Sequence, residues 1–343
     1  MADTEFLICG AHGGRGQLWK FRSVQLITQM CEPRRRTGIG RPMRTGQYAG
    51  DGVVGMTRVS PIYVADSRQC CLPPRVRMGC MDLNLKDKVA VVTGGSKGIG
   101  LAIASRLAAE GAIVVVGSRS VSDELAAVRD DQGVSVVPVD LATAQGPGEL
   151  ISAAVDAHGG LDILINNVGA SEPGPTFADI DDDAWQRIFD VTFFSTVRTS
   201  RAALPSLIAR EGAIVNIGSI NARLPDPAIA HYSAAKAALS NLNKSLAIEL
   251  APHKVRVNQI SPGPVRTPFW TAPGGFAHVV AGAAGTTPEQ AVDDVVPQAL
   301  GILTGRFSEA EEVASLALFL ASSQAANITG ADYVLDGGTI KTV

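Results

Sequence analysis

Three polar side chains in the second half of the chain have the types and spacing of an acid–base unit: Ser219, Tyr232 and Lys236. Tyr232 and Lys236 stand four residues apart in Tyr232-Ser-Ala-Ala-Lys236, which places both on one face of a helix. A free tyrosine has a pKa of about 10, and an ammonium group about 4 Å away could bring that pKa toward neutrality. Ser219 could hold a substrate oxygen beside the phenol. A tyrosine and a lysine at this spacing, taken by themselves, also fit a non-catalytic interpretation, in which a partly buried tyrosine lies beside a solvated lysine.

A second stretch, from Lys88 to Gly100, reads KVAVVTGGSKGIG. The apolar run Val89–Val92 has the length of a buried parallel strand, and a helical pattern follows from Ile99 to Glu110. Glycines between them would let backbone approach a pyrophosphate at the helix N-terminus. This indicates a mononucleotide-binding unit, although an ordinary strand-to-helix turn looks similar and the spacing differs from G-x-G-x-x-G. The glycines are Gly94, Gly98 and Gly100.

The chain from Val89 onward alternates strand and helix patterns, which predicts a parallel sheet covered by helices on both faces. No internal repeat or second core pattern is evident, so a single domain over residues 81–343 is expected. The expected strands are Val89–Val92, Ala112–Gly117, Val134–Val139, Leu161–Ile165, Ala213–Ile217, Val255–Ile260 and Asp332–Leu335. The expected helices are Ile99–Glu110, Asp123–Asp131, Gly148–His158, Asp183–Ile208, His231–Leu250 and Glu309–Ala321.

The composition is that of a globular protein, with 343 residues, 46% hydrophobic and 18% charged. No apolar run approaches the roughly 18 residues of a membrane span, and a net charge of −3 gives no reason to expect a nucleic-acid partner. The first eighty residues differ from the rest: they hold 12 Lys and Arg against 5 Asp and Glu, and all five cysteines. A body free of cysteine suits a cytoplasmic enzyme.

Residues 1–80 are rich in arginine and glycine and show no sustained periodicity. Their cysteines lack the paired spacing of a zinc site, so no metal site is expected. We expect this segment to be disordered, or to be non-native upstream sequence preceding a start at Met81. A basic nucleic-acid-binding tail or an organelle-targeting segment is the alternative.

Five motifs follow one another in the chain, each at the end of a predicted strand or in the helix after it. The chain from residue 84 to 340 thereby resembles the compact single-domain branch of the short-chain dehydrogenase/reductase family, including members similar to 3-oxoacyl-carrier-protein reductases. The resemblance implies a Rossmann-type, doubly wound, seven-stranded parallel sheet with helices on both faces. It also implies a homotetramer or homodimer. The motifs are Thr93–Gly100, Asn166–Gly169, Ser219, Tyr232–Lys236 and Ser261–Thr267.

The resemblance further implies an oxidoreductase that interconverts a ketone and a secondary alcohol with a nicotinamide cofactor. Tyr232 would be the general acid in reduction and the base in oxidation, Lys236 would lower its pKa and bind the nicotinamide ribose, and Ser219 would orient the carbonyl. Besides Tyr232 and Lys236, the implied cofactor contacts are Gly94, Ser96, Lys97, Gly98, Ile99, Asp140, Leu141, Asn167, Gly169, Pro262, Gly263, Val265 and Thr267.

Cofactor choice is indicated at the end of the second predicted strand. NAD-specific members of the family usually carry an aspartate there, where this chain has Ser118 followed by Arg119. With Lys97, these residues favour the 2′-phosphate of NADP(H), and NAD(H) stays possible because Arg119 could be a solvated loop residue.

Two positions depart from the family pattern: Val168 replaces a usual alanine, and Thr192 replaces a usual asparagine that supports a proton-relay water. Thr192 is either a tolerated variant or the mark of a cofactor-binding regulatory or scaffold protein with weak turnover. The segment from Pro268 to Gly305 is expected to form a mobile lid, and its aromatic and small residues suggest a partly hydrophobic carbonyl substrate.

Overall fold

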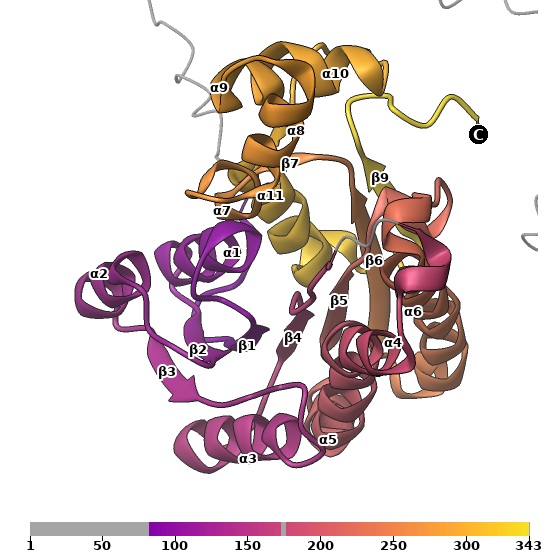
Figure 1. Ribbon diagram of the computed structural model, residues 1–343. Coiled ribbons are helices and arrows are strands. Elements are labelled where there is room, and N and C mark those ends of the chain that lie inside the picture. Colours follow the sequence, from indigo (N-terminus) through magenta and orange to yellow (C-terminus); the bar gives the residue numbers. More distant parts are fainter. Residues whose placement is uncertain (1–81, 173–175, 343) are drawn as a thin grey trace, which may run out of the picture. The chain divides into compact units, whose positions relative to one another are not determined.

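A seven-stranded parallel sheet forms the centre of the molecule, in the order β3-β2-β1-β4-β5-β6-β9 (Figure 1). The computed structural model describes residues 82–172 and 176–342, so the expectations for residues 1–80 lie outside the described residues. The sheet confirms the predicted Rossmann-type fold class. Its strands are β1 (Val89–Thr93), β2 (Ile113–Ser118), β3 (Ser135–Pro138), β4 (Ile163–Asn166), β5 (Ala213–Ile217), β6 (Arg256–Pro262) and β9 (Asp332–Leu335).

Helices cover both faces of the sheet, as Figure 1 shows. They are α1 (Gly98–Ala109), α2 (Asp123–Gln132), α3 (Gly146–His158), α4 (Asp182–Phe189), α5 (Ser195–Arg210), α6 (Ala230–Leu250) and α11 (Ala310–Ala321). Among the described helices, no apolar stretch has the length needed to cross a bilayer.

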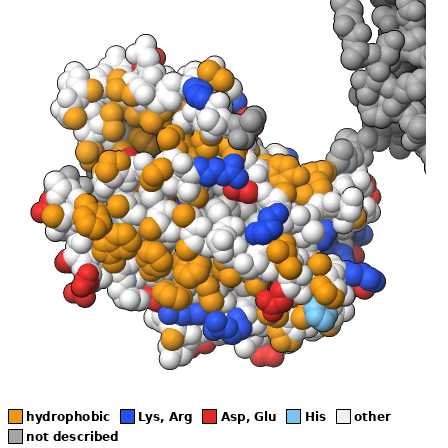
Figure 2. All heavy atoms as spheres, turned by 90° about the vertical axis from the view of Figure 1, so that its right-hand side faces the viewer, with side chains coloured by type: hydrophobic (Ala, Val, Ile, Leu, Met, Phe, Trp, Pro, Cys, Tyr) orange, Lys and Arg blue, Asp and Glu red, His pale blue; other side chains and the backbone are white. Residues whose placement is uncertain are grey.

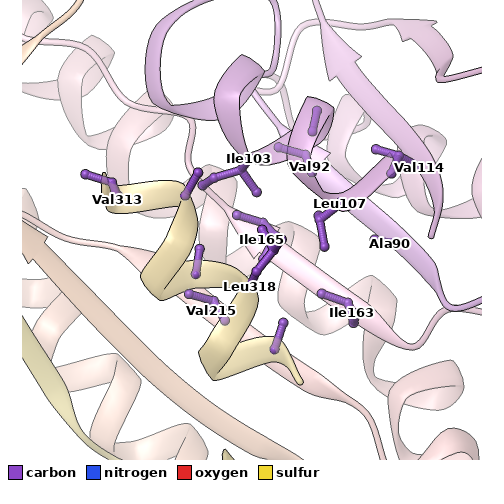
Figure 3. Packing of buried hydrophobic residues seen from close by; sticks show 14 of the residues in the cluster. Ala90, Val92, Ile103, Leu107, Val114, Ile163, Ile165, Val215, Val313 and Leu318 are labelled. Carbon is purple, nitrogen blue, oxygen red and sulfur yellow. The ribbon is translucent and has the colours of Figure 1, made fainter. Parts of the chain in front are cut away.

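The two sheet faces divide the core between them because successive strand residues point to opposite sides. Val92 of β1 belongs to the cluster that packs against α1 and α11, where Ile103 and Leu318 are buried (Figure 3). Val91 belongs to the other cluster, which packs against α3, α5 and α6. Burial on both faces explains why these strands read as continuous apolar runs rather than alternating patterns.

The long helix predicted from Asp183 to Ile208 is interrupted. A π-helical turn, Asp190–Phe194, separates α4 from α5, and Thr192 lies within it. Beside this turn the Ser195 hydroxyl donates to the backbone oxygen of Val191, at 2.7 Å. Serine hydroxyls compete in this way with backbone donors, which favours local departures from the α-helical ladder.

The remaining elements follow the prediction with bounds shifted by one or two residues. The third helix begins at Gly146 rather than Gly148 because Pro147 is accommodated in the first turn, where its missing N–H costs nothing. The third strand ends at Pro138, one residue before the predicted end.

The segment predicted as a lid consists mainly of short helices, drawn in orange at the top of Figure 1. They are α7 (Pro268–Thr271), α8 (Phe276–Ala284), α9 (Pro288–Gln290) and α10 (Val296–Ala299), with a π-helical turn at Ala291–Val295. A small apolar cluster of its own, including Ala277, Val292 and Phe307, holds this lid segment together. Two short paired strands, β7 (Val265–Arg266) and β8 (Ser308–Glu309), close its base. Its mobility stays a prediction.

Candidate active site

The glycine turn between β1 and α1 is shaped so that side chains are excluded from it. Gly94 and Gly98 have φ values of +68° and +57°, in the left-handed region that favours glycine. At Gly100 a larger residue is prevented by lack of room and not by the backbone conformation, since an added Cβ would lie 2.5 Å from Asn167 Nδ2. The glycines of the turn therefore form a cradle of backbone at the N-terminus of α1, which suits a phosphate group.

Hydrogen bonds from the end of β4 hold this turn in place. The Thr93 hydroxyl accepts from the backbone N–H groups of Asn167 and Val168, at 2.9 and 3.1 Å. The Asn167 side chain donates to the backbone oxygens of Thr93 and Gly94, at 2.9 and 3.0 Å. The resemblance had implied that Asn167 contacts a ribose. In the structure its amide N–H groups are occupied by the glycine turn, so the turn and β4 form one unit.

The N-terminus of α2 is tied to the same turn. The Ser122 hydroxyl accepts from Leu125 N and donates to the backbone oxygen of Ser96, at 3.1 and 2.5 Å. Lys97 and Arg119 are both exposed, and neither has an ion-pair partner within the ranges described. Two exposed cations therefore line the same cleft as Ser118, the last residue of β2.

A cleft of about 280 Å³ runs along the carboxyl edge of the sheet beside the glycine turn. Most cofactor residues implied by the sequence line it: Gly94, Ser96, Lys97, Gly98, Ile99, Ser118, Arg119, Asp140, Leu141, Asn167, Gly169 and Thr267. Pro262, Gly263, Val265, Tyr232 and Lys236 do not line this cleft. Lining residues that the prediction missed are Gly100, Gly117, Val139, Val168, Ala170, Val191, Pro268 and Phe269.

Val191 could not be found from the sequence, because the π-helical turn brings it to the cleft, whereas Phe269 belongs to the segment predicted as a lid. Gly100 carried a signal, as the third glycine of the turn. Gly263 packs instead against the backbone of Asp336, where an added Cβ would lie 2.9 Å from its Cα. Pro262 and Gly263 thus join the end of β6 to the end of β9, where Gly263 N donates to Leu335 O at 2.9 Å.

Ser219, Tyr232 and Lys236 come together at the carboxyl ends of β5 and β6. Ser219 lies two residues after the end of β5, and α6 carries the other two on adjacent turns. Lys236 is buried and donates from Nζ to the backbone oxygen of Ile217, at 2.7 Å. Its Nζ lies 5.7 Å from the centre of the Tyr232 ring. Tyr232 is half-buried, and Ser219 is buried within hydrogen-bonding reach of the phenol.

Burial dominates the electrostatics of this group. It raises the pKa of Tyr232 above its ordinary value, and the hydrogen bond with Ser219 offsets part of that rise. The direction is opposite to the lowering by Lys236 that the spacing had suggested. Burial also lowers the pKa of Lys236 to about 8, because the charged ammonium has lost its water and no carboxylate replaces it.

Thr192 is fully buried beside the same lysine. An added Cβ at Gly169 would lie 3.5 Å from Lys236 Nζ and 3.8 Å from Thr192 Oγ1. The Thr192 hydroxyl lies 3.3 Å from both the backbone N and the backbone O of Ala170. Thr192 therefore fastens the loop after β4 where the family's asparagine usually stands.

Comparison with known proteins shows the family of the chain. Residues 94–339 match the family profile described as enoyl-(acyl carrier protein) reductase. The chain is 36% identical over 265 residues to dehydrogenase/reductase SDR family member 4 of Bos taurus, covering 75% of this chain and 88% of that protein. The chain belongs to the short-chain dehydrogenase/reductase family. It is accordingly an NAD(P)-dependent oxidoreductase that acts on CH–OH donors.

Two solved structures are similar throughout the domain. The L-sorbose reductase of Gluconobacter frateurii, in complex with NADPH and L-sorbose, has a TM-score of 0.71 at 35% identity and covers 77% of this chain and all of that one. An NADPH-bound short-chain oxidoreductase of Pseudomonas aeruginosa, described as containing an atypical catalytic center, has a TM-score of 0.66 at 34% identity, covering 75% and 98%.

The cradle should not tolerate a methyl group at Gly100. The added Cβ of Gly100→Ala would collide with Asn167 Nδ2 and displace the glycine turn. We expect the affinity for the dinucleotide to fall by about tenfold to a hundredfold, measured by calorimetric titration. Gly148→Ala is the matched control, because nothing lies within 4 Å of its added Cβ, and it should bind normally. Equal affinity of both variants for the dinucleotide would contradict the assignment of the glycine turn as its binding site.

The lowered pKa of Lys236 predicts a pH-dependent stability. Between the folded value of about 8 and the ordinary value of 10.5, the unfolded chain holds a proton that the folded chain has released. The free energy of unfolding therefore rises with pH across this window, and the cost of burial is fully present below it. Between the lower and the upper end of this pH window, the free energy of unfolding of the wild type should rise by up to about 3 kcal/mol relative to that of Lys236→Met, as measured by urea denaturation. A constant difference at all pH values would refute this.

Proposed function

We propose that the protein is an NADP(H)-dependent oxidoreductase that interconverts a ketone and a secondary alcohol, with Ser219, Tyr232 and Lys236 as its acid–base unit. The observation that supports this most directly is the buried Lys236, whose Nζ lies 5.7 Å from the centre of the Tyr232 ring and donates to the backbone oxygen of Ile217, two residues before Ser219. The glycine cradle opens at the same carboxyl edge of the sheet. A carbonyl oxygen held by both hydroxyls would receive a proton from the phenol.

The bound nicotinamide would supply a hydride to the carbonyl carbon, or accept one from the alcohol carbon. In reduction, the Tyr232 phenol gives its proton to the substrate oxygen, so that the C=O bond becomes CH–OH. The phenol, whose pKa burial raises, carries its proton at neutral pH, as donation to the substrate oxygen requires. Ser219 orients the oxygen, and the Lys236 ammonium fixes the end of β5 through Ile217 and offers a donor to the ribose.

Preference for the 2′-phosphate rests on Lys97 and Arg119, which both line the cleft, and on Ser118 at the end of β2, where NAD-specific members of the family usually carry an aspartate. The two structural relatives named above were solved with NADPH. A carveol dehydrogenase of Mycobacterium avium, 26% identical with a TM-score of 0.69, was solved with NAD, so NAD(H) stays a second cofactor candidate.

The substrate is proposed to be a partly hydrophobic carbonyl compound. Phe269 lines the cleft, is about half exposed, and stacks on Phe276 with ring centres 6.0 Å apart. Trp270 packs edge-on against Phe276 at 5.0 Å, so three aromatic rings stand at the base of the lid segment. This wall favours contact with apolar substrate surface.

One observation favours a second candidate function. Thr192 has no amide and its hydroxyl is engaged with the Ala170 backbone, so the water relay usual in the family lacks its support. A cofactor-binding regulatory or scaffold protein with weak turnover would have the same structure. Cofactor binding without hydride transfer across a broad carbonyl panel would favour that alternative.

We further propose a homotetramer or homodimer formed through α4, α5 and α6, located in the cytoplasm. Hydrophobic side chains gather on the side of the molecule shown in Figure 2, and Ile248 of α6 is 70% exposed. Contiguous exposed apolar surface marks interaction sites. The absence of cysteine after residue 80 supports the location, and residues 81–343 are proposed as a single catalytic domain.

The cofactor proposal is tested by thermal-shift titration with NADPH and NADH side by side. A ligand at about 100 times its Kd should stabilise the fold by about 2.7 kcal/mol, and NADPH should act at the lower concentration. Arg119→Ala should lower the affinity for NADPH by about tenfold and leave the affinity for NADH unchanged, because one charge-assisted hydrogen bond to the 2′-phosphate is lost. Arg129→Ala, an exposed arginine on α2, is the control. A shift with NADH alone would overturn the preference.

The acid–base unit is tested by Tyr232→Phe. The variant keeps the ring but loses the proton donor, so carbonyl reduction should fall by at least about a hundredfold while NADPH binding is retained. Steady-state kinetics over a carbonyl panel measures the loss. Full turnover by this variant would contradict the proposed mechanism.

A further inference from the structure

Ser219 sits at the start of a tight turn, Ser219–Leu224, that leads from β5 toward α6. Its hydroxyl accepts from Asn221 N and donates to Asn221 Oδ1, both at 3.1 Å. Arg223 and Leu224 donate from their backbone nitrogens to Ile220 O, at 2.8 and 2.7 Å. The backbone of this Ser219 turn is therefore ordered locally, but these bonds do not attach it to the sheet.

Arg223 adds a side-chain attachment to the sheet, besides the backbone N–H of Gly218, which donates to Ile260 O of β6 at 2.6 Å. Arg223 Nη2 donates to Asp332 Oδ2 on the edge strand β9, at 2.8 Å. The other carboxylate oxygen, Asp332 Oδ1, accepts from the hydroxyl of Ser261 on β6, at 2.7 Å. One carboxylate thus holds both the outer side of the Ser219 turn and a strand beneath it. The Arg223 side chain is 50% exposed and that of Asp332 is 15% exposed.

Two side chains of β6, Gln259 and Ser261, pack against Gly218, the residue before Ser219. An added Cβ there would lie 2.6 Å from Gln259 Nε2 and 2.8 Å from Ser261 Oγ, so these side chains press against the residue before Ser219. Gln259 Nε2 also donates to Ser240 Oγ, at 2.6 Å.

Ser240 in turn donates to the backbone oxygen of Lys236, at 3.2 Å. The hydrogen bonds thus run from Asp332 through Ser261, Gln259 and Ser240 to the helix that carries the lysine.

We propose that Arg223 is a positioning residue for Ser219, acting through its ion pair with Asp332; this inference rests on the proposed function. A hydroxyl that must meet both a substrate oxygen and the Tyr232 phenol needs a fixed location, since displacements of about 1 Å are costly in catalysis. An exposed ion pair contributes little to global stability. The effect of Arg223 should therefore appear in the rate and in the ionisation of Tyr232, and not in folding.

The test uses Arg223→Ala in the full chain, with alcohol oxidation and ketone reduction measured across pH. We expect kcat to fall by about tenfold while the Kd for NADPH and the midpoint of thermal unfolding stay near wild type. The interaction with Ser219 lowers the pKa of Tyr232. If Ser219 is less well positioned, that pKa should rise, and the increase of the oxidation rate at alkaline pH should move to higher pH. Arg223→Lys, which keeps the charge, should recover part of the rate.

Lys254→Ala is the matched control. It also breaks an exposed ion pair, with Glu211 at 2.7 Å, but at the opposite edge of the sheet, and it should leave kcat and the pH profile unchanged.

A double-mutant cycle separates positioning from a general structural role. If Arg223 acts through Ser219, Arg223→Ala should have no further effect on the residual rate or pH profile of Ser219→Ala. A full effect in that background, wild-type kinetics of Arg223→Ala, or a loss of rate that follows a loss of thermal stability would each overturn the inference. If instead Ser219→Ala and Tyr232→Phe both keep full turnover, the proposed function fails and the inference falls with it.

Discussion

The hydrogen-bond lock between Thr93 and Asn167 is the constraint on which the site depends. Thr93 ends β1 and Asn167 follows the neighbouring strand β4, and four hydrogen bonds among these two residues, Gly94 and Val168 join the two strand ends. The lock closes one side of the glycine cradle, which is why Gly100 has no room for a side chain. It also fixes the loop after β4, whose Gly169 lies near Lys236 and Thr192.

The burial of Lys236 and Tyr232 is the second feature on which the site depends. Lys236 has a backbone carbonyl as its hydrogen-bond acceptor, and the pKa values of the lysine and the tyrosine move in the directions that favour their neutral forms. The fold therefore holds an acid that keeps its proton and a lysine that can lose its own near pH 8. Perturbed groups of this kind at a cleft are typical of catalytic sites.

Much of this was predictable because the signals are local. Apolar runs such as Val89–Val92 predict buried strands from burial alone, and the seven expected strands all occur. Four-residue spacing placed Tyr232 and Lys236 on adjacent turns of one helix. The break at Asp190–Phe194 was not predictable, because the apolar period continues across a π-helical turn while the backbone bonds do not.

The sequence by itself determined the strand-and-helix order, the glycine turn and the residue types of the acid–base unit, since each depends on neighbours within a few positions. Tertiary structure alone decided that Asn167 donates to the glycine turn, that Val191 reaches the cleft, and that burial raises the pKa of Tyr232. It also decided that Asp332 meets Arg223 across 109 positions of chain. Such pairings follow from strand order and solvent exclusion, which no short stretch of residues encodes.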